Sequence, residues 1–155
     1  MNARDDPPSS GPAHPDLLFV YGTLRRGCMG EPARRLAGES DWLGMAHVQG
    51  RLYRIGGYPG LRMSEQDNGP DSWPGWGTVT GDLIRLHNPA ITLDWLDAYE
   101  EVGGAFPEPW EYRRVVTAVT VAGDEQPITT PAWTYVYNWP VDGLEHIAGG
   151  NWLTE

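Results

Sequence analysis

Short apolar runs alternate with turn signals along most of the chain. The first run, residues 17–21, ends at Gly22, which predicts a strand that leads into a turn. Later runs show either apolar and polar alternation or the high content of Val, Thr, Tyr and Trp that strands favour. These runs are residues 46–56, 78–86, 111–122 and 131–139. We expect the last two to pair as neighbours across a turn at Gly123-Asp124.

Two segments have the features of helices. Residues 31–44 have helical content in their first half, with Pro32 suited to the helix start and Gly38 to its end. Residues 89–101 form the strongest helical pattern, because Pro89 suits a first turn and apolar side chains recur near helical spacing. Those side chains belong to Ile91, Trp95, Leu96 and Tyr99.

The remaining stretches lack a regular pattern. Residues 1–15, rich in Pro, Ser and Asp, predict a flexible tail. Residues 56–64 carry the Gly and Pro of a turn, and residues 65–77 predict a loop. The order of elements predicts an α+β fold whose largely antiparallel or mixed sheet closes toward a barrel. We expect residues 16–155 to form a single domain.

Charge excludes several function classes. The chain has 21 acidic and 11 basic residues, a formal net charge of -10 that repels nucleic acid and anionic membranes. All 11 basic residues are arginine, so no lysine is present for Schiff-base chemistry. We therefore expect a protein with no nucleic-acid or membrane partner, and the sequence leaves its oligomeric state open.

Cysteine and histidine usage gives no metal or thiol site. Cys28 is the only cysteine, so an intramolecular disulfide and a multi-cysteine metal cluster are excluded and a cytoplasmic setting is the simplest interpretation. Cys28 and His47 could form a nucleophile and base, but nothing in the sequence brings them together. The four histidines, His14, His47, His87 and His146, are scattered. Without metal-ligand spacing or a phosphate-binding loop, we expect no metal and no cofactor.

Carboxylates are the remaining candidates for chemistry. Glu100 ends the strongest helix and lies three residues after Asp97, which places both on roughly one face. A carboxylate near a helix C-terminus is disfavoured by the helix dipole, which raises its pKa if the group is also partly buried. The pattern alone allows two interpretations: a solvated acidic helix end or a general base.

Six stretches follow one another in a recognisable order: "FVYGTLRRG", "GRLYRIGGYPGL", "TGDLIRL", "LDWLDAYEE", "YRRVVTAVTV" and "WTYVYNW". Together they resemble the γ-glutamylcyclotransferase-like family, which includes γ-glutamylamine cyclotransferases and AIG2-like proteins. The resemblance covers about residues 17–139. It implies a small mixed, mostly antiparallel β-barrel flanked by helices, with a cavity beside the YGTL turn.

The resemblance also implies roles for particular residues. In the family the backbone of the YGTL turn holds the α-carboxylate of a γ-glutamyl substrate, a role that falls here on Tyr21, Gly22, Thr23 and Leu24. The glutamate of the LDxYE segment is the acid/base, and Glu100 matches it. Tyr112 and Tyr137 are expected to line the pocket.

The resemblance thus implies an enzyme that converts a γ-glutamyl amine or γ-glutamyl amino acid into 5-oxoproline and a free amine. The α-amine of the substrate is the nucleophile, so no metal or cofactor is needed. Two alternatives stay open: a non-catalytic small-molecule-binding or interaction protein, and another amide-cleaving or amide-rearranging activity on the same fold.

Three features need a structure to interpret. Many family members have a glycine after the catalytic glutamate, whereas Glu101 follows here and either raises the pKa of Glu100 or points into water. Trp73 and Trp76 in the 65–77 loop could stack on a substrate or pack structurally. Arg25 and Arg26 either attract an anionic substrate or are a solvated pair.

Overall fold

Strands dominate the structure, a computed structural model that describes residues 15–63 and 77–154. The strands are β1 (Leu17–Val20), β2 (Ser40–Arg54), β3 (Pro59–Met63), β4 (Gly77–Leu86), β5 (Tyr112–Val121), β6 (Ile128–Tyr137) and β7 (Glu145–Ile147). The helices are α1 (Glu31–Gly38), α2 (Pro89–Tyr99) and a 3-10 turn at Trp152–Thr154.

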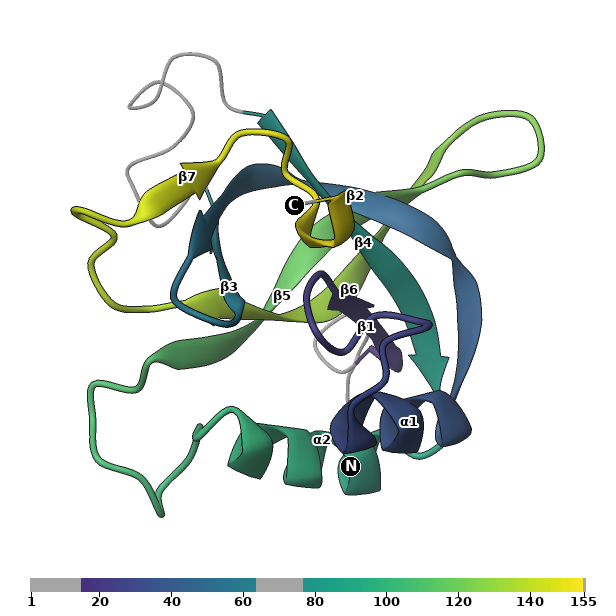
Figure 1. Ribbon diagram of the computed structural model, residues 1–155. Coiled ribbons are helices and arrows are strands. Elements are labelled where there is room, and N and C mark those ends of the chain that lie inside the picture. The colour runs from purple at the N-terminus through teal and green to yellow at the C-terminus, as the bar shows by residue number, and fades with distance from the viewer. Residues whose placement is uncertain (1–14, 64–76, 155) are drawn as a thin grey trace, which may run out of the picture.

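Five strands close into a barrel in the order β2-β4-β1-β6-β5, with β5 returning to pair with β2. The closure is short, pairing Ala46 with Val121 and His47 with Thr120. β1 and β6 run parallel, whereas the other pairings are antiparallel. Figure 1 shows the strands as a ring with α1 and α2 along one side of it. The predicted mixed, mostly antiparallel barrel flanked by helices is confirmed.

The barrel wall has an apolar core on each side, because successive side chains of a strand point to opposite faces. In β1, Phe19 belongs to the cluster inside the barrel, together with Val48 of β2. Its neighbour Leu18 belongs to a second cluster, in which Leu36 of α1 and Leu96 of α2 cover the outside of the wall. β1 is therefore buried on both faces, which explains why its sequence is a continuous apolar run.

The observed elements differ from the predicted ones mainly around β2. The helix over 31–44 ends at Gly38, as predicted for its first half, but β2 begins at Ser40 and includes the residues after it. Residues 59–63, predicted as part of a turn, form β3 against β2. Gly60 allows this strand to pack closely, because a Cβ there would lie 2.9 Å from the Tyr137 ring. Pro59 takes the first position of the strand, where a missing N–H is tolerated.

Other predictions hold or fall outside the described residues. The helix over 89–101 is α2, and the strands over 111–122 and 131–139 are the antiparallel pair β5 and β6. The predicted tail over 1–15 and the loop over 65–77, with Trp73 and Trp76, lie almost wholly outside the described residues. Among those that are described, no helix is both long and apolar enough to cross a membrane.

Candidate active site

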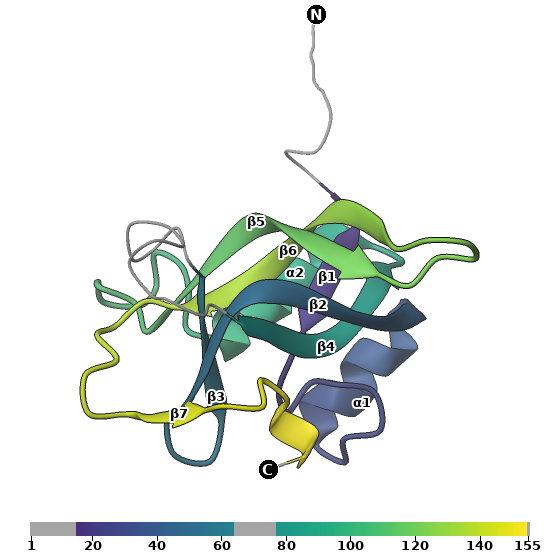
Figure 2. The ribbon, with the colours of Figure 1, turned by 90° about the horizontal axis from the view of Figure 1, so that it is seen from above.

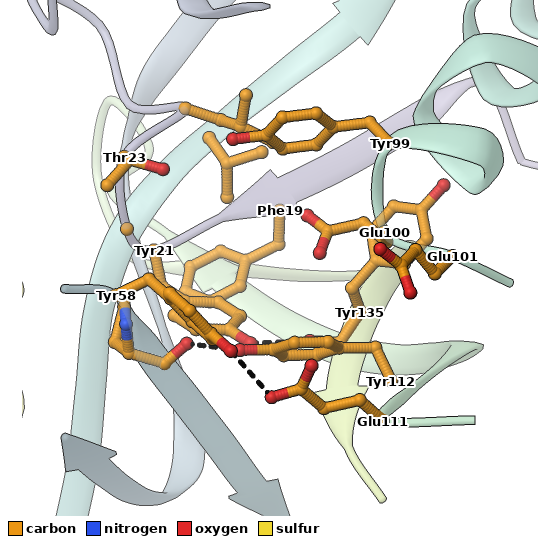
Figure 3. A pocket seen from close by; sticks show the side chains of 14 residues that line it. Phe19, Tyr21, Thr23, Tyr58, Tyr99, Glu100, Glu101, Glu111, Tyr112 and Tyr135 are labelled. Atoms are coloured by element: carbon orange, nitrogen blue, oxygen red, sulfur yellow. Dashed lines mark hydrogen bonds between the residues drawn. The ribbon is translucent and has the colours of Figure 1, made fainter. Parts of the chain in front are cut away.

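A cavity of about 270 Å³ opens between the end of β1, the end of α2 and the starts of β3 and β5. Figure 3 shows its lining side chains. They come from residues 19–24, from Tyr58 and Pro59, from residues 99–101, and from Glu111, Tyr112 and Tyr135. Segments far apart in the sequence, including the YGTL turn and the LDxYE segment, therefore meet at one cavity.

The YGTL turn presents backbone to this cavity. Arg25 donates its backbone N–H to the Gly22 carbonyl at 3.1 Å, which closes the turn. Within the described part of the chain, the N–H groups of Gly22, Thr23 and Leu24 have no acceptor. A Cβ on Gly22 would lie 2.7 Å from Cγ of Pro59, so only glycine fits this close approach. Free N–H groups in a turn are a natural place to hold an anion.

Arg25 supports the turn from behind rather than facing the cavity. Its side chain is 5% exposed, and its guanidinium pairs with the Asp82 carboxylate at 3.4 Å. Asp82 also accepts the Arg26 backbone N–H at 2.9 Å, and Asn151 accepts a further Arg25 N–H at 2.9 Å. The 3-10 turn at Trp152–Thr154, which directly follows Asn151, lies beside the loop after β1 in both ribbon views (Figures 1 and 2).

Arg25 matches neither of its predicted roles, whereas Arg26 is exposed, as predicted for a solvated arginine. The Arg25 side chain is buried, and its guanidinium is paired with the Asp82 carboxylate. Arg25 is therefore neither solvated nor directed at the cavity. Arg26 has its guanidinium 4.1 Å from the centre of the Trp42 ring, a cation–π contact outside the cavity lining.

Helix α2 is held at both ends. Near its start, Thr92 and Trp95 donate hydrogen bonds to the Glu39 carboxylate at 2.5 and 2.9 Å, and these bonds lower the pKa of Glu39 to about 2. Near its end, Asp97 accepts two bonds from Arg114, at 2.8 and 3.0 Å, and one from the Tyr135 hydroxyl at 2.7 Å. Asp97 therefore fixes the helix to β5 and β6, and only the residues after it reach the cavity.

Glu100 is the C-cap of α2 and donates its backbone N–H to the Leu96 carbonyl at 2.8 Å. Its side chain extends into the cavity (Figure 3). Burial, followed by the nearby Glu111 carboxylate, raises the pKa of Glu100 from 4.5 to about 7. The neighbour that raises this pKa is thus Glu111 rather than Glu101. A carboxyl group with this pKa can both accept and donate a proton near neutral pH.

The hydroxyl groups of Tyr21 and Tyr112 are already used by the fold. Tyr21 donates to the Tyr135 carbonyl at 2.7 Å and accepts the Leu61 N–H at 3.2 Å. Tyr112 donates to the Pro59 carbonyl at 2.8 Å. Burial raises the pKa of both phenols well above 10. These residues present ring surface to the cavity and tie its walls together.

Tyr137 does not line the cavity. Its ring packs edge-on behind Tyr112, with centroids 5.6 Å apart, and against Gly60 on the other side. The β6 residue at the cavity wall is Tyr135, two positions earlier on the same face of the strand. The alternation of side chains along β6 could have suggested Tyr135 in place of Tyr137. Nothing in the sequence shows that Tyr112 covers the end of β6, where Tyr137 lies.

Sequence reasoning also missed Tyr58 and Glu111. The Tyr58 hydroxyl donates to the Glu111 carboxylate at 2.8 Å, and burial together with this bond raises the pKa of Tyr58 to about 12. Tyr58 lies in the segment predicted to be a plain turn, whereas Glu111 immediately precedes Tyr112. The only signal for Glu111 is its position at the start of the "YRR" strand.

Comparison with known proteins assigns the chain to a family. Residues 18–154 match the family described as "Gamma-glutamyl cyclotransferase, AIG2-like". A relative in Escherichia coli strain K12, "Gamma-glutamylcyclotransferase family protein YtfP", is 36% identical over 146 residues, covering 88% of this chain and 95% of the relative. The chain belongs to the AIG2-like γ-glutamylcyclotransferase family.

Two further similarities agree with the AIG2-like assignment. A protein of Niallia circulans, "Gamma-L-glutamyl-butirosin B gamma-glutamyl cyclotransferase", is 30% identical over 145 residues, covering 85% of this chain and 80% of the relative. The crystal structure of an AIG2-like protein from Mus musculus superposes with a TM-score of 0.53 at 20% identity, covering 90% of this chain and 95% of that one. The second similarity concerns the fold.

Glu101 follows Glu100 in a backbone conformation that L side chains rarely adopt. Its φ is 60°, in the left-handed region that favours glycine. Its N–H donates to the Ala98 carbonyl at 3.2 Å, as expected for the residue that ends a helix. Glu101 nevertheless lines the cavity. The chain therefore has an acidic side chain at a backbone position where glycine would be less strained.

Replacing Glu101 with glycine should stabilise the fold by about 1 kcal/mol, because a non-glycine residue costs about 1–2 kcal/mol in this conformation and glycine loses part of that gain through unfolded-state entropy. Urea unfolding measures the change. Glu101→Ala is the matched control: it removes the same carboxylate but keeps the left-handed strain, so it should give little stabilisation. Equal stabilisation by both variants would assign the effect to charge and contradict the prediction.

Proposed function

We propose that this protein is a γ-glutamylcyclotransferase that converts a γ-glutamyl amide into 5-oxoproline and a free amine, with Glu100 as the general acid/base. The observation that carries the proposal is the position of the Glu100 carboxylate, which extends into the same cavity as the backbone of residues 21–24. The family assignment and the names of the relatives point in the same direction.

The chemistry needs little beyond one proton carrier. The α-amine of the substrate attacks the side-chain carbonyl carbon, a new C–N bond closes a five-membered ring, and the bond to the leaving nitrogen breaks. The α-ammonium loses two protons in this process, and the leaving nitrogen gains two as it becomes an ammonium. Glu100 takes protons from the first nitrogen and returns them to the second, so atoms and charge balance with no other reactant.

The turn contributes by positioning. The N–H groups of Gly22, Thr23 and Leu24 bind the α-carboxylate, which fixes one end of a flexible chain. The aromatic rings of Tyr21 and Tyr112 restrict the other torsions, so the substrate is held near the ring-closing conformation. Holding nucleophile and carbonyl together removes much of the entropic barrier to such a reaction.

The test is release of 5-oxoproline from a panel of γ-glutamyl amines, γ-glutamyl amino acids and glutathione. Turnover of at least one member distinguishes an enzyme from a binding protein of the same fold. If none is turned over while one or more bind, the protein is a binder and the proposal is wrong. Release of free glutamate instead of 5-oxoproline would indicate another amide-cleaving activity.

The rate should depend on pH through Glu100. Because attack requires an ionised Glu100, kcat/KM should fall tenfold per pH unit below a midpoint near the Glu100 pKa of about 7. Glu111→Gln removes a carboxylate that raises this pKa, so the midpoint should move to lower pH. The pH profiles of both proteins, measured with one substrate, check this. An unchanged midpoint in Glu111→Gln would contradict the assignment.

A further inference from the structure

Five of the described residues that line the cavity are tyrosines, and in four of them the fold already uses the hydroxyl group. Two of these hydroxyls donate to backbone carbonyls and two to carboxylates; they belong to Tyr21, Tyr112, Tyr58 and Tyr135. Within the described part of the chain, the hydroxyl of the fifth, Tyr99, has no hydrogen-bond partner. The Tyr99 hydroxyl is therefore available to a ligand, as donor or as acceptor.

Tyr99 is the last residue of α2, and its side chain is 47% exposed at the cavity. Figure 3 shows its ring extending from the end of the helix across the cavity, with the hydroxyl group at the end nearest Thr23. Tyr99 therefore points toward the turn over residues 21–24, which lines the same cavity.

The contacts on both sides of Tyr99 hold it in this position. Asp97, two residues earlier, accepts hydrogen bonds from Arg114 at 2.8 Å and from the Tyr135 hydroxyl at 2.7 Å. Glu100, the next residue, donates its backbone N–H into the last turn of α2 at 2.8 Å. Because the backbone around Tyr99 is fixed before a ligand enters, binding to its hydroxyl needs little further ordering.

A carboxylate bound in this cavity depends on uncharged donors. Among the described residues that line it there is no arginine and no histidine, and the chain has no lysine. The charged groups of the lining are the carboxylates of Glu100, Glu101 and Glu111. The remaining donors are backbone N–H groups and hydroxyl groups, and their hydrogen bonds to a carboxylate are stronger than those to a neutral acceptor.

The positions of Tyr99 and Glu100 suit the amino-acid end of a γ-glutamyl substrate. The α-carboxylate and the α-ammonium are attached to the same carbon atom, so the groups that bind them must be neighbours. Glu100 is the proposed acceptor of the ammonium protons, and Tyr99 directly precedes it in the chain. A substrate with its ammonium group at Glu100 thus has its α-carboxylate between the turn and the Tyr99 hydroxyl.

We propose, building on the cyclotransferase function proposed above, that Tyr99 is a substrate-binding residue whose hydroxyl donates a hydrogen bond to the α-carboxylate. The carboxylate is then held from two sides, by the N–H groups of residues 22–24 and by the end of α2. The bond involves no reacting atom, so it is equally strong in the bound substrate and in the transition state. Tyr99 therefore contributes to KM rather than to kcat.

Binding of 5-oxoproline, the expected product, tests the proposal without requiring turnover. Tyr99→Phe keeps the ring and removes only the hydroxyl, so 5-oxoproline, which has the α-carboxylate, should bind about tenfold more weakly. 2-Pyrrolidinone is the same ring without the carboxylate and should bind equally to the parent and the variant. NMR titration of both proteins with each ligand measures the affinities. Thermal unfolding should give the same Tm for both proteins, because no described residue bonds to this hydroxyl.

Tyr58→Phe is the matched control. Tyr58 lines the same cavity and is 39% exposed, but its hydroxyl is bound to the Glu111 carboxylate. Its removal should change the affinity for 5-oxoproline by about twofold or less. An equal loss in Tyr58→Phe and Tyr99→Phe would assign the effect to the polarity of the cavity wall and overturn the assignment to Tyr99.

Steady-state kinetics separates binding from chemistry. With the best substrate of the panel, Tyr99→Phe should raise KM about tenfold and leave kcat within about twofold of the parent. A fall in kcat at unchanged KM would place the Tyr99 hydroxyl at the reacting atoms and overturn its role at the α-carboxylate.

Failure of this inference differs from failure of the cyclotransferase function. If Tyr99→Phe binds 5-oxoproline as tightly as the parent, or the parent does not bind it, the role of Tyr99 is wrong even where 5-oxoproline is released. If the affinity falls as expected but no γ-glutamyl amide of the panel releases 5-oxoproline, the cyclotransferase function fails and Tyr99 stands only as a residue that binds the carboxylate of a ligand.

Discussion

Replacing Glu100 with glutamine should lower kcat for 5-oxoproline release by about 10³-fold, within the range that general acid–base catalysis contributes. Glutamine has nearly the same size but cannot carry a proton between the α-amine and the leaving nitrogen. KM should change little, because the turn over residues 21–24 that binds the α-carboxylate is untouched. Steady-state kinetics with the best substrate of the panel measures both parameters.

Stability provides the control for this variant. The pKa of Glu100 is raised from 4.5 to about 7 in the folded protein, so the stability linked to its neutral form is present below about pH 4.5 and is lost as the pH rises through about 7. Glutamine stays neutral, so Glu100→Gln should be about 1–2 kcal/mol more stable than the parent near pH 8 and nearly equal to it near pH 4.5.

If Glu100→Gln is inactive but more stable than the parent, its loss of activity does not come from unfolding. Glu125→Gln, which removes a carboxylate on an exposed loop, should keep both activity and stability. If Glu100→Gln retained full activity, Glu100 would not be the acid/base and another lining carboxylate would have to be tested.

Most strands and α2 could be predicted from the sequence because each is a local pattern. β1 is a continuous apolar run, and α2 has a proline in its first turn and an Asn88 cap whose side chain accepts the Ile91 N–H. β3 could not be predicted, because Pro59 and Gly60 are residues that typically indicate a turn. The strand forms through its antiparallel pairing with residues 50–54 of β2, and Gly60 leaves room for the Tyr137 ring beside it.

The site likewise contains residues that the motifs predict and residues whose roles depend on tertiary contacts. Motif order suggested that residues 21–24 and Glu100 belong to one cavity, and the structure brings them together. The roles of Asp97 and Arg25 depend on partners distant in the sequence: Arg114 for Asp97, and Asp82 for Arg25. No local pattern encodes such pairs. Glu101 and Glu111 likewise reach the cavity from separate segments.

Removing the charge of Asp82 should damage both the fold and the turn. Asp82 is 3% exposed and neutralises the Arg25 guanidinium, which is equally buried. Asp82→Asn leaves that positive charge without a counter-ion, and breaking a buried pair in this way costs about 3 kcal/mol or more. Chemical denaturation measures the loss. Glu145→Gln, which breaks the exposed pair with Arg54, should cost about 1 kcal/mol or less.

The functional consequence of Asp82→Asn should appear in KM rather than in kcat. Asp82 holds the Arg26 N–H, and Arg25 closes the turn on Gly22, so a loosened turn binds the α-carboxylate less well while Glu100 stays in place. If Asp82→Asn does not fold, Asn151→Ala removes one Arg25 contact at smaller cost and should raise KM several-fold. A variant that lowers kcat at unchanged KM would place this network with the proton transfer and contradict its role in holding the turn.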